Sequence, residues 1–161
     1  MIQEQPIVHD TFVIDRIFDA PPARVFEALA NPEIKAKWFA GPPGWKEHER
    51  IHDFRVGGRD RTSGTHAGGI TSVFDAQYFD IVPNERVVYA YEMTINGRKI
   101  STSLATFELS AVGGKTKLLL TEQGAYFEDP DMRKYAPQGQ AASRLEGTKG
   151  LMDQFAAMFA R

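Results

Sequence analysis

The sequence predicts an α+β fold in which a curved antiparallel sheet of about six to seven strands packs around one long C-terminal helix. Residues 47–123 alternate between apolar and polar residues and are broken by turn residues, which is the pattern of successive β-strands. Residues 141–160 instead repeat apolar residues three and four positions apart, which is typical of an amphipathic helix. No internal repeat, linker or low-complexity tract divides the 161 residues. We therefore expect a single domain over residues 1–161.

The N-terminal part predicts one strand followed by two short helices. The segment "TFVIDRIFDA" (11–20) is typical of a strand, and the Pro21-Pro22 pair ends it, so the first helix begins near Pro22. Asn31, Pro32 and Glu33 then provide a capping side chain, a first-turn proline and a first-turn acid in the right order. A second short helix is expected to follow and to end before the Gly-Pro-Pro stretch at 41–43.

The central part predicts a meander of strands. The expected strands lie near residues 48–56, 59–65, 70–81, 86–95, 99–110 and 115–123. The strongest turn signal is Asn96-Gly97, because both central residues of a type I′ hairpin turn need positive φ angles. A sheet with one apolar face has to bury that face, and only the C-terminal helix is long enough to cover it.

The C-terminal helix carries its apolar residues on one stripe. The stripe comprises Leu145, Thr148, Met152, Phe155 and Phe159, and Leu151 and Met158 widen it. We expect Leu145, Met152, Phe155 and Phe159 to lie against the strand face that carries Tyr89 and Tyr91.

The composition excludes several classes of protein. The chain has no cysteine, which rules out disulfides, thiolate zinc sites and a cysteine nucleophile. Its formal net charge is −2, with no basic block to bind nucleic acid or an anionic membrane surface. The N-terminus lacks the features of a secretion signal, and no apolar run approaches the roughly 18 residues of a membrane span. We expect a cytoplasmic monomer or homodimer that binds small molecules or proteins.

No cofactor or metal is expected. His48 and His52 lie on one face of a predicted strand, but four residues of strand separate them by roughly 13 Å, too far to share one ion. The "GGKT" stretch (113–116) ends like a phosphate-binding loop, but Leu109 stands where that motif needs a glycine. Ser101 and Ser103 share a strand face without a nucleophile elbow or an assignable histidine. No catalytic residue is predicted.

A curved sheet around one helix rarely packs solid, so the sequence predicts a cavity between them. The two short helices close one end, which places its mouth near Trp38. Large apolar pockets with a few polar groups are the usual sites for small molecules. The expected ligand-binding residues are Trp38, Phe39, Phe54, Tyr89, Tyr91, Met93, Phe107, Glu122, Leu145 and Met152.

Glu122 is the charged residue of most interest. In "TKLLLTEQG" it shares a strand face with Leu118 and Leu120, so it faces the cavity if the leucines do. A buried carboxylate needs a partner, and Arg50, Arg59 or Arg61 could supply one. The alternative is that Glu122 lies half in water at the end of its strand, as part of a structural ion pair.

Five segments, in order, resemble the START-like (SRPBCC) superfamily and its branch of homologues of the activator of the 90-kDa heat-shock protein ATPase. They are "DAPPARVFEALANPEIKAKWF", "FRVGGR", "IVPNERVVYAY", "GGKTKLLLTEQG" and "LMDQFAAMF". The resemblance covers roughly residues 11–160 and implies the helix-grip fold with a cavity for a hydrophobic ligand. Asp60 is a departure, because relatives often carry an aromatic residue there.

Three functions follow as hypotheses. The first is binding of a small, mostly apolar molecule in the cavity. The second, which the resemblance implies for some relatives, is a co-chaperone-like interaction protein, and an exposed apolar patch outside the cavity would favour it. The third is a cofactor-free enzyme of the polyketide cyclase or hydrolase kind, which a buried Glu122 close to a tyrosine or arginine would favour.

Overall fold

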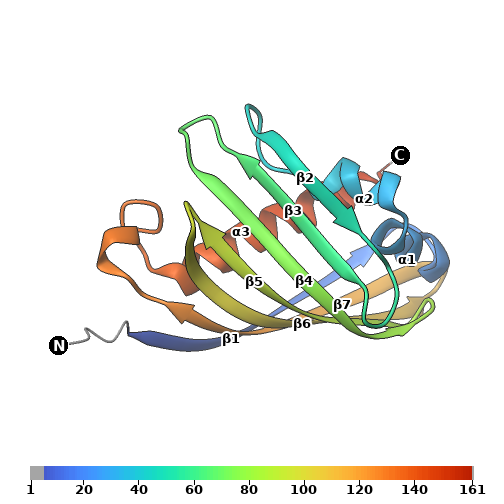
Figure 1. Ribbon diagram of the computed structural model, residues 1–161. Coiled ribbons are helices and arrows are strands. Elements are labelled where there is room, and N and C mark those ends of the chain that lie inside the picture. Colours follow the sequence, from blue (N-terminus) through green and yellow to red (C-terminus); the bar gives the residue numbers. More distant parts are fainter. Residues whose placement is uncertain (1–5, 161) are drawn as a thin grey trace.

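The computed structural model describes residues 6–160 (Figure 1). The elements follow one another as β1 (Ile7–Phe18), α1 (Pro22–Ala30), α2 (Pro32–Trp38), β2 (Lys46–His52), β3 (Arg59–Thr65), β4 (Thr71–Val82), β5 (Arg86–Ile95), β6 (Arg98–Val112), β7 (Lys115–Phe127), the short 3-10 turn η1 (Pro130–Met132) and α3 (Gln140–Ala157).

Within residues 6–160 the strands form one seven-stranded antiparallel sheet in the order β1-β7-β6-β5-β4-β3-β2. Strands β2 to β7 are a meander, and β1 pairs with β7 from Ile7 opposite Phe127 to Phe18 opposite Thr116. The sheet curves around α3, which crosses one of its faces (Figure 1). The predicted α+β helix-grip fold is thereby confirmed.

Local signals in the sequence act as expected at the first helices and at one hairpin. The Asn31 side chain accepts hydrogen bonds from the backbone N–H groups of Glu33 and Ile34, at 2.9 and 3.2 Å. Asn96 and Gly97 have φ angles of 49° and 79° in the turn between β5 and β6.

Some predicted boundaries were wrong. β1 begins at Ile7, four residues before the predicted start, because its whole length pairs with β7. β2 ends at His52, and the next residues form a turn in which the Gly57 N–H donates to the Tyr78 carbonyl oxygen. β7 continues to Phe127, so Glu122 lies inside the strand and not at its end.

The C-terminal half of α3 packs on β1 and α2. The Phe155 side chain is fully buried, with its ring centroid 5.1 Å from that of Phe18 and 4.7 Å from that of Trp38. The expectation that this stripe contacts the strand face of Tyr89 and Tyr91 was therefore wrong for Phe155. The curvature of the sheet brings β1 close to α3 but leaves a cavity in front of β5.

A buried ion pair joins α2 to β3. The Lys35 ammonium contacts Asp60 Oδ2, which also accepts a hydrogen bond of 2.7 Å from the Tyr78 hydroxyl. His52 Nδ1 lies 3.1 Å from the same oxygen, and His52 Nε2 lies 3.0 Å from the Ala30 carbonyl oxygen. Asp60 thus provides a buried charge that links α2 to the sheet.

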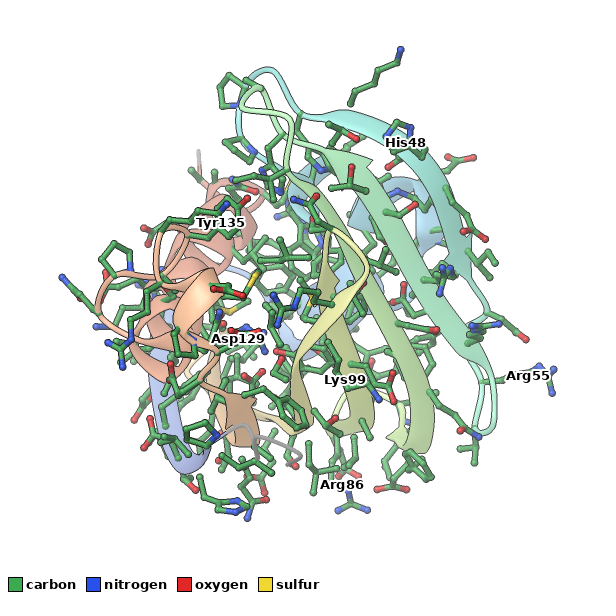
Figure 2. All side chains as sticks on the ribbon, turned by 60° about the vertical axis from the view of Figure 1, so that its left-hand side comes forward. His48, Arg55, Arg86, Lys99, Asp129 and Tyr135 are labelled. Atoms are coloured by element: carbon green, nitrogen blue, oxygen red, sulfur yellow. The ribbon has the colours of Figure 1, made fainter. Side chains whose placement is uncertain are left out.

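Charged side chains project from the outside of the molecule. Figure 2 shows Arg55 and Arg86 pointing into solvent, and the Arg55 side chain is 71% exposed. Over residues 6–160, no helix is long and apolar enough to span a membrane.

Candidate ligand-binding site

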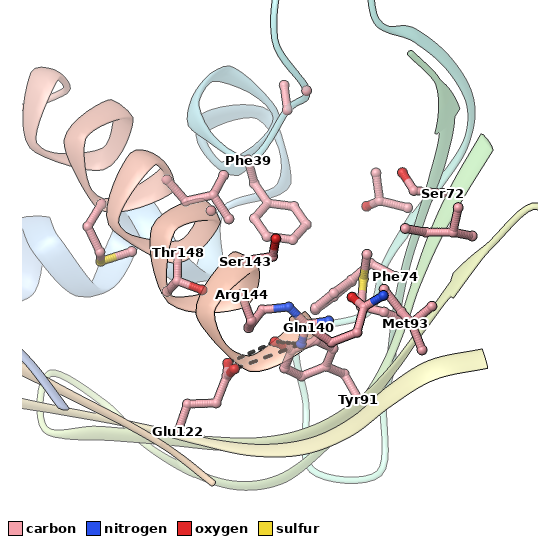
Figure 3. Close-up of a pocket in the computed structure, with 18 of the residues that line it drawn as sticks. Phe39, Ser72, Phe74, Tyr91, Met93, Glu122, Gln140, Ser143, Arg144 and Thr148 are labelled. Carbon is pink, nitrogen blue, oxygen red and sulfur yellow. Dashed lines mark hydrogen bonds and ion pairs between the residues drawn. The ribbon is translucent and has the colours of Figure 1, made fainter. Parts of the chain in front are cut away.

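A cavity of about 370 Å³ lies between α3 and the concave face of the sheet (Figure 3). This volume is within the range of roughly 300–1,000 Å³ that small-molecule sites occupy. β5 contributes Tyr89, Tyr91 and Met93 to the wall, and β4 contributes Phe74. The lining is mainly apolar and aromatic, as the sequence predicts for this space.

The structure brings most of the predicted site residues to this cavity. Those that line it are Trp38, Phe39, Tyr89, Tyr91, Met93, Phe107, Glu122 and Met152. Their contact with a ligand stays a prediction.

The two other predicted residues, Phe54 and Leu145, do not line the cavity. Phe54 follows the end of β2, and its ring packs against Phe26 of α1 and Tyr78 of β4, at centroid distances of 5.6 and 5.0 Å. Leu145 is half-buried and packs on the edge of the core. The α3 residues that line the cavity are Gln140, Ser143, Arg144, Gly147, Thr148, Leu151 and Met152, and Leu145 lies beside this row on the helix.

Glu122 lies on the cavity wall, with only 3% of its surface exposed. Its Oε1 accepts a hydrogen bond of 2.8 Å from the Tyr91 hydroxyl, and its Oε2 lies 3.9 Å from Nη1 of Arg144 (Figure 3). The Tyr126 hydroxyl donates to Oε2 at 3.4 Å. The carboxylate is therefore inside the protein and paired, in contrast to the alternative that placed it half in water.

The arginine partner is Arg144 of α3, so the expectation of Arg50, Arg59 or Arg61 was wrong. Arg50 donates to the Phe39 carbonyl oxygen and pairs with Glu47, whereas Arg59 and Arg61 both pair with Asp75. Because β2 and β3 lie at the opposite side of the sheet from β7, their side chains cannot reach Glu122.

Arg144 connects the helix to three strands. Its Nη1 donates to the Tyr91 hydroxyl at 2.8 Å, and its Nη2 donates to the Ser101 hydroxyl at 2.6 Å. The guanidinium also lies over the Tyr91 and Tyr126 rings, 5.3 and 5.6 Å from their centroids. We call Glu122, Arg144, Tyr91, Tyr126 and Ser101 the polar cluster.

Burial shifts the acidity of the polar cluster. It raises the pKa of Glu122 above the ordinary value, against the opposing effects of the nearby Arg144 charge and the hydrogen bond from Tyr91. Burial and the charge of Glu122 also raise the pKa of Tyr126 to about 12. Burial raises the pKa of Tyr91 as well, so both phenols remain protonated donors at neutral pH.

Sequence reasoning missed the polar residues that α3 contributes to the cavity, Gln140, Ser143 and Arg144. Gln140, Arg144, Thr148 and Met152 are spaced four residues apart and so follow one another along a helix face. Extending the predicted apolar stripe toward the N-terminus would have found Arg144 beside it.

Trp45 also lines the cavity, although it was absent from the predicted set. Its ring lies against Gly64 of β3, where an added Cβ atom would come within 2.2 Å of the indole. Both tryptophans of the protein, Trp38 and Trp45, therefore border the same space. Intrinsic fluorescence should report directly on anything that enters it.

In the part of the chain from residue 6 to 160, no group of three or more His, Cys, Asp or Glu side chains is placed to hold a metal ion.

A curved antiparallel sheet, a long C-terminal helix and a cavity between them define a helix-grip protein. Residues 19–160 match the family described as "Activator of Hsp90 ATPase homolog 1-like protein". The chain therefore belongs to this family.

Two solved structures share the fold over nearly the whole chain. An uncharacterized protein from Rhizobium leguminosarum is 37% identical, with 98% of each chain covered and a TM-score of 0.87. The Mll3558 protein from Rhizobium loti is 39% identical, with 94% of this chain and 98% of that chain covered and a TM-score of 0.81. No protein with a curated description matches the chain.

Proposed function

We propose that the protein binds a small, mostly apolar molecule in the cavity between the sheet and α3. The observation that carries this proposal is a cavity walled by aromatic rings whose polar groups converge in one buried cluster. Apolar walls supply affinity through burial, and a few fixed polar groups orient the bound molecule.

Filling the cavity from the helix should abolish binding. Gly147 lines the cavity, and a Cβ atom added there would meet no atom within 4 Å. We expect Gly147→Phe to weaken binding of the neutral dye N-phenyl-1-naphthylamine by roughly tenfold or more, because the new ring occupies the space. Titration of dye emission and of tryptophan fluorescence measures this loss.

Gly150→Phe is the matched control, because Gly150 is an exposed glycine of the same helix that does not line the cavity. It should bind the dye like the wild type. Met152→Phe fills the cavity from a position that is 2% exposed and should repeat the loss. Unchanged binding in both cavity variants would contradict the proposal.

A second candidate function is acid–base catalysis on the bound molecule without a cofactor. It is favoured by the buried Glu122, whose pKa is raised and which lies beside Tyr91 and Arg144 within the cavity. In a screen of aromatic esters, Glu122→Gln should then lower turnover by about 10²–10⁴-fold and leave dye binding in place. Equal turnover by the variant would exclude this role for Glu122.

A co-chaperone-like role, to which the family's name points, also stays a prediction. Val13 and Ile17 of the edge strand β1 are 56% and 59% exposed and offer apolar contact outside the cavity. In this case the protein should stimulate the ATPase of a purified 90-kDa heat-shock protein, and Val13→Asp should reduce the stimulation.

A further inference from the structure

The charges that line the cavity compensate one another. Among the lining residues of the described chain, Glu122 and Arg144 are the side chains that carry full charges. His66 also lines the cavity, is half-buried, and has its Nε2 3.1 Å from the Ser72 hydroxyl. Glu122 and Arg144 are 3.9 Å apart and share the Tyr91 hydroxyl, which donates to the carboxylate and accepts from the guanidinium. The net charge of the polar cluster is therefore zero.

Both charged groups already have partners inside the protein. Glu122 accepts from two tyrosines, and Arg144 donates to Tyr91 and Ser101. An anion that approached Arg144 would also meet Glu122, and a cation that approached Glu122 would also meet Arg144. A charged ligand would lose its hydration in an apolar cavity without gaining an unpaired countercharge.

Two uncharged polar side chains flank this pair and have no partner of their own. Gln140 and Thr148 lie one helical turn before and after Arg144, are 5% and 8% exposed, and line the cavity. Within residues 6–160 neither the Gln140 carboxamide nor the Thr148 hydroxyl hydrogen-bonds to another group, whereas the Gln140 backbone N–H donates to Glu128. Both side chains face the cavity without a hydrogen bond to another side chain or to the backbone of the described residues, so a ligand there can hydrogen-bond to them.

We infer that the bound molecule carries an uncharged polar group, such as a hydroxyl, carbonyl or carboxamide, which hydrogen-bonds to Gln140 or Thr148 beside the compensated Glu122–Arg144 pair. The Gln140 carboxamide offers an acceptor oxygen and two N–H donors, and the Thr148 hydroxyl can both donate and accept. A neutral donor or acceptor on the ligand can therefore find a partner. This inference rests on the proposed binding function and adds the chemical class of the ligand's polar end.

The test compares three naphthalene compounds that differ in charge. 1-Naphthalenemethanol is neutral, whereas 1-naphthoate and 1-naphthylmethylammonium are ionised at pH 7. Each competes with N-phenyl-1-naphthylamine for the wild-type protein. We expect the alcohol to compete at least about tenfold more strongly than either ion, because neither ion recovers its hydration energy.

Glu122→Gln should change this preference in one direction. Glutamine has nearly the same size and shape as glutamate, but it is uncharged and leaves the Arg144 charge uncompensated. We expect 1-naphthoate to gain at least about tenfold relative to the alcohol in this variant. Glu92→Gln is the matched control, because Glu92 is exposed and pairs with Lys99 outside the cavity. Its preferences should equal those of the wild type.

The outcomes separate the inference from the proposed function. Wild-type protein that binds naphthoate or the ammonium compound as tightly as the alcohol overturns the inference and leaves the cavity as a binding site. This comparison uses only the wild-type protein, so its result does not depend on whether any variant folds. If neither the dye nor any of the three compounds binds, the proposed function fails, and the inference fails with it.

Discussion

Replacing Phe155 by alanine is expected to lower the free energy of unfolding by about 3–5 kcal/mol. The Phe155 ring is fully buried where three elements meet, and it contacts Phe18 of β1, Trp38 of α2 and Phe159 beyond α3 at centroid distances of 4.7–5.1 Å. Truncation removes the apolar contact area and leaves a cavity that these rigid rings cannot close. Urea denaturation followed by far-ultraviolet circular dichroism measures the change.

Phe79→Ala is the control for this prediction. Phe79 has the same side chain on β4, but it is 55% exposed. Its loss should cost less than about 1 kcal/mol, since little buried area is removed. A cost for Phe155→Ala as small as that for Phe79→Ala would show that α3 is not anchored through this ring.

Asp60→Asn is expected to lower the free energy of unfolding by about 3–5 kcal/mol, because it leaves the Lys35 ammonium buried without a countercharge. The Lys35 and Asp60 side chains are 7% and 2% exposed, so water cannot replace the lost partner. The control is Asp53→Asn, which breaks an exposed pair with Arg55 whose side chains are 45% and 71% exposed. Surface pairs of this kind contribute at most about 1 kcal/mol.

The double variant Lys35→Met with Asp60→Asn tests the stated cause. It removes both charges, so no ion is left without a partner and most of the stability should return. If the double variant is as unstable as Asp60→Asn alone, the loss arises from the hydrogen bonds of Tyr78 and His52 and not from the stranded ammonium. Equilibrium unfolding of the wild type, Asp53→Asn, Asp60→Asn and the double variant makes this comparison.

The environment of Asp60 also leads us to expect that the stability of the protein falls at acidic pH. Burial acts to raise the pKa of Asp60, but the charge of Lys35 and the hydrogen bonds from His52, Lys35 and Tyr78 outweigh it and hold this pKa well below the ordinary 3.8. A depressed pKa contributes stability that is complete above the ordinary value and is lost as the pH falls through 3.8 toward the folded value. Asp60→Asn should lack this component of the acid dependence.

The local structure of this protein could be predicted from the sequence because its causes lie within a few residues. Asn31 caps α2 through the two backbone N–H groups that follow it, and Asn96-Gly97 adopts the positive φ angles of its turn. The apolar spacing of the C-terminal segment likewise placed Met152 and Phe155 on the buried side of α3. From these elements the sheet wrapped around one helix followed, whereas the sequence left open whether Glu122 faces the cavity or lies half in water at the end of its strand.

The partners of the buried charges were decided by the tertiary structure. Periodicity shows which residues share a face, but it does not show which distant faces meet. Arg144 reaches Glu122 only because α3 crosses the strand that carries the carboxylate, and Lys35 reaches Asp60 only because α2 lies on β3. Phe54 lies outside the cavity because the turn after β2 places its ring against Phe26 of α1 and Tyr78 of β4. The sheet's curvature, a property of all its strands together, sets where the helix touches it and where the cavity remains open.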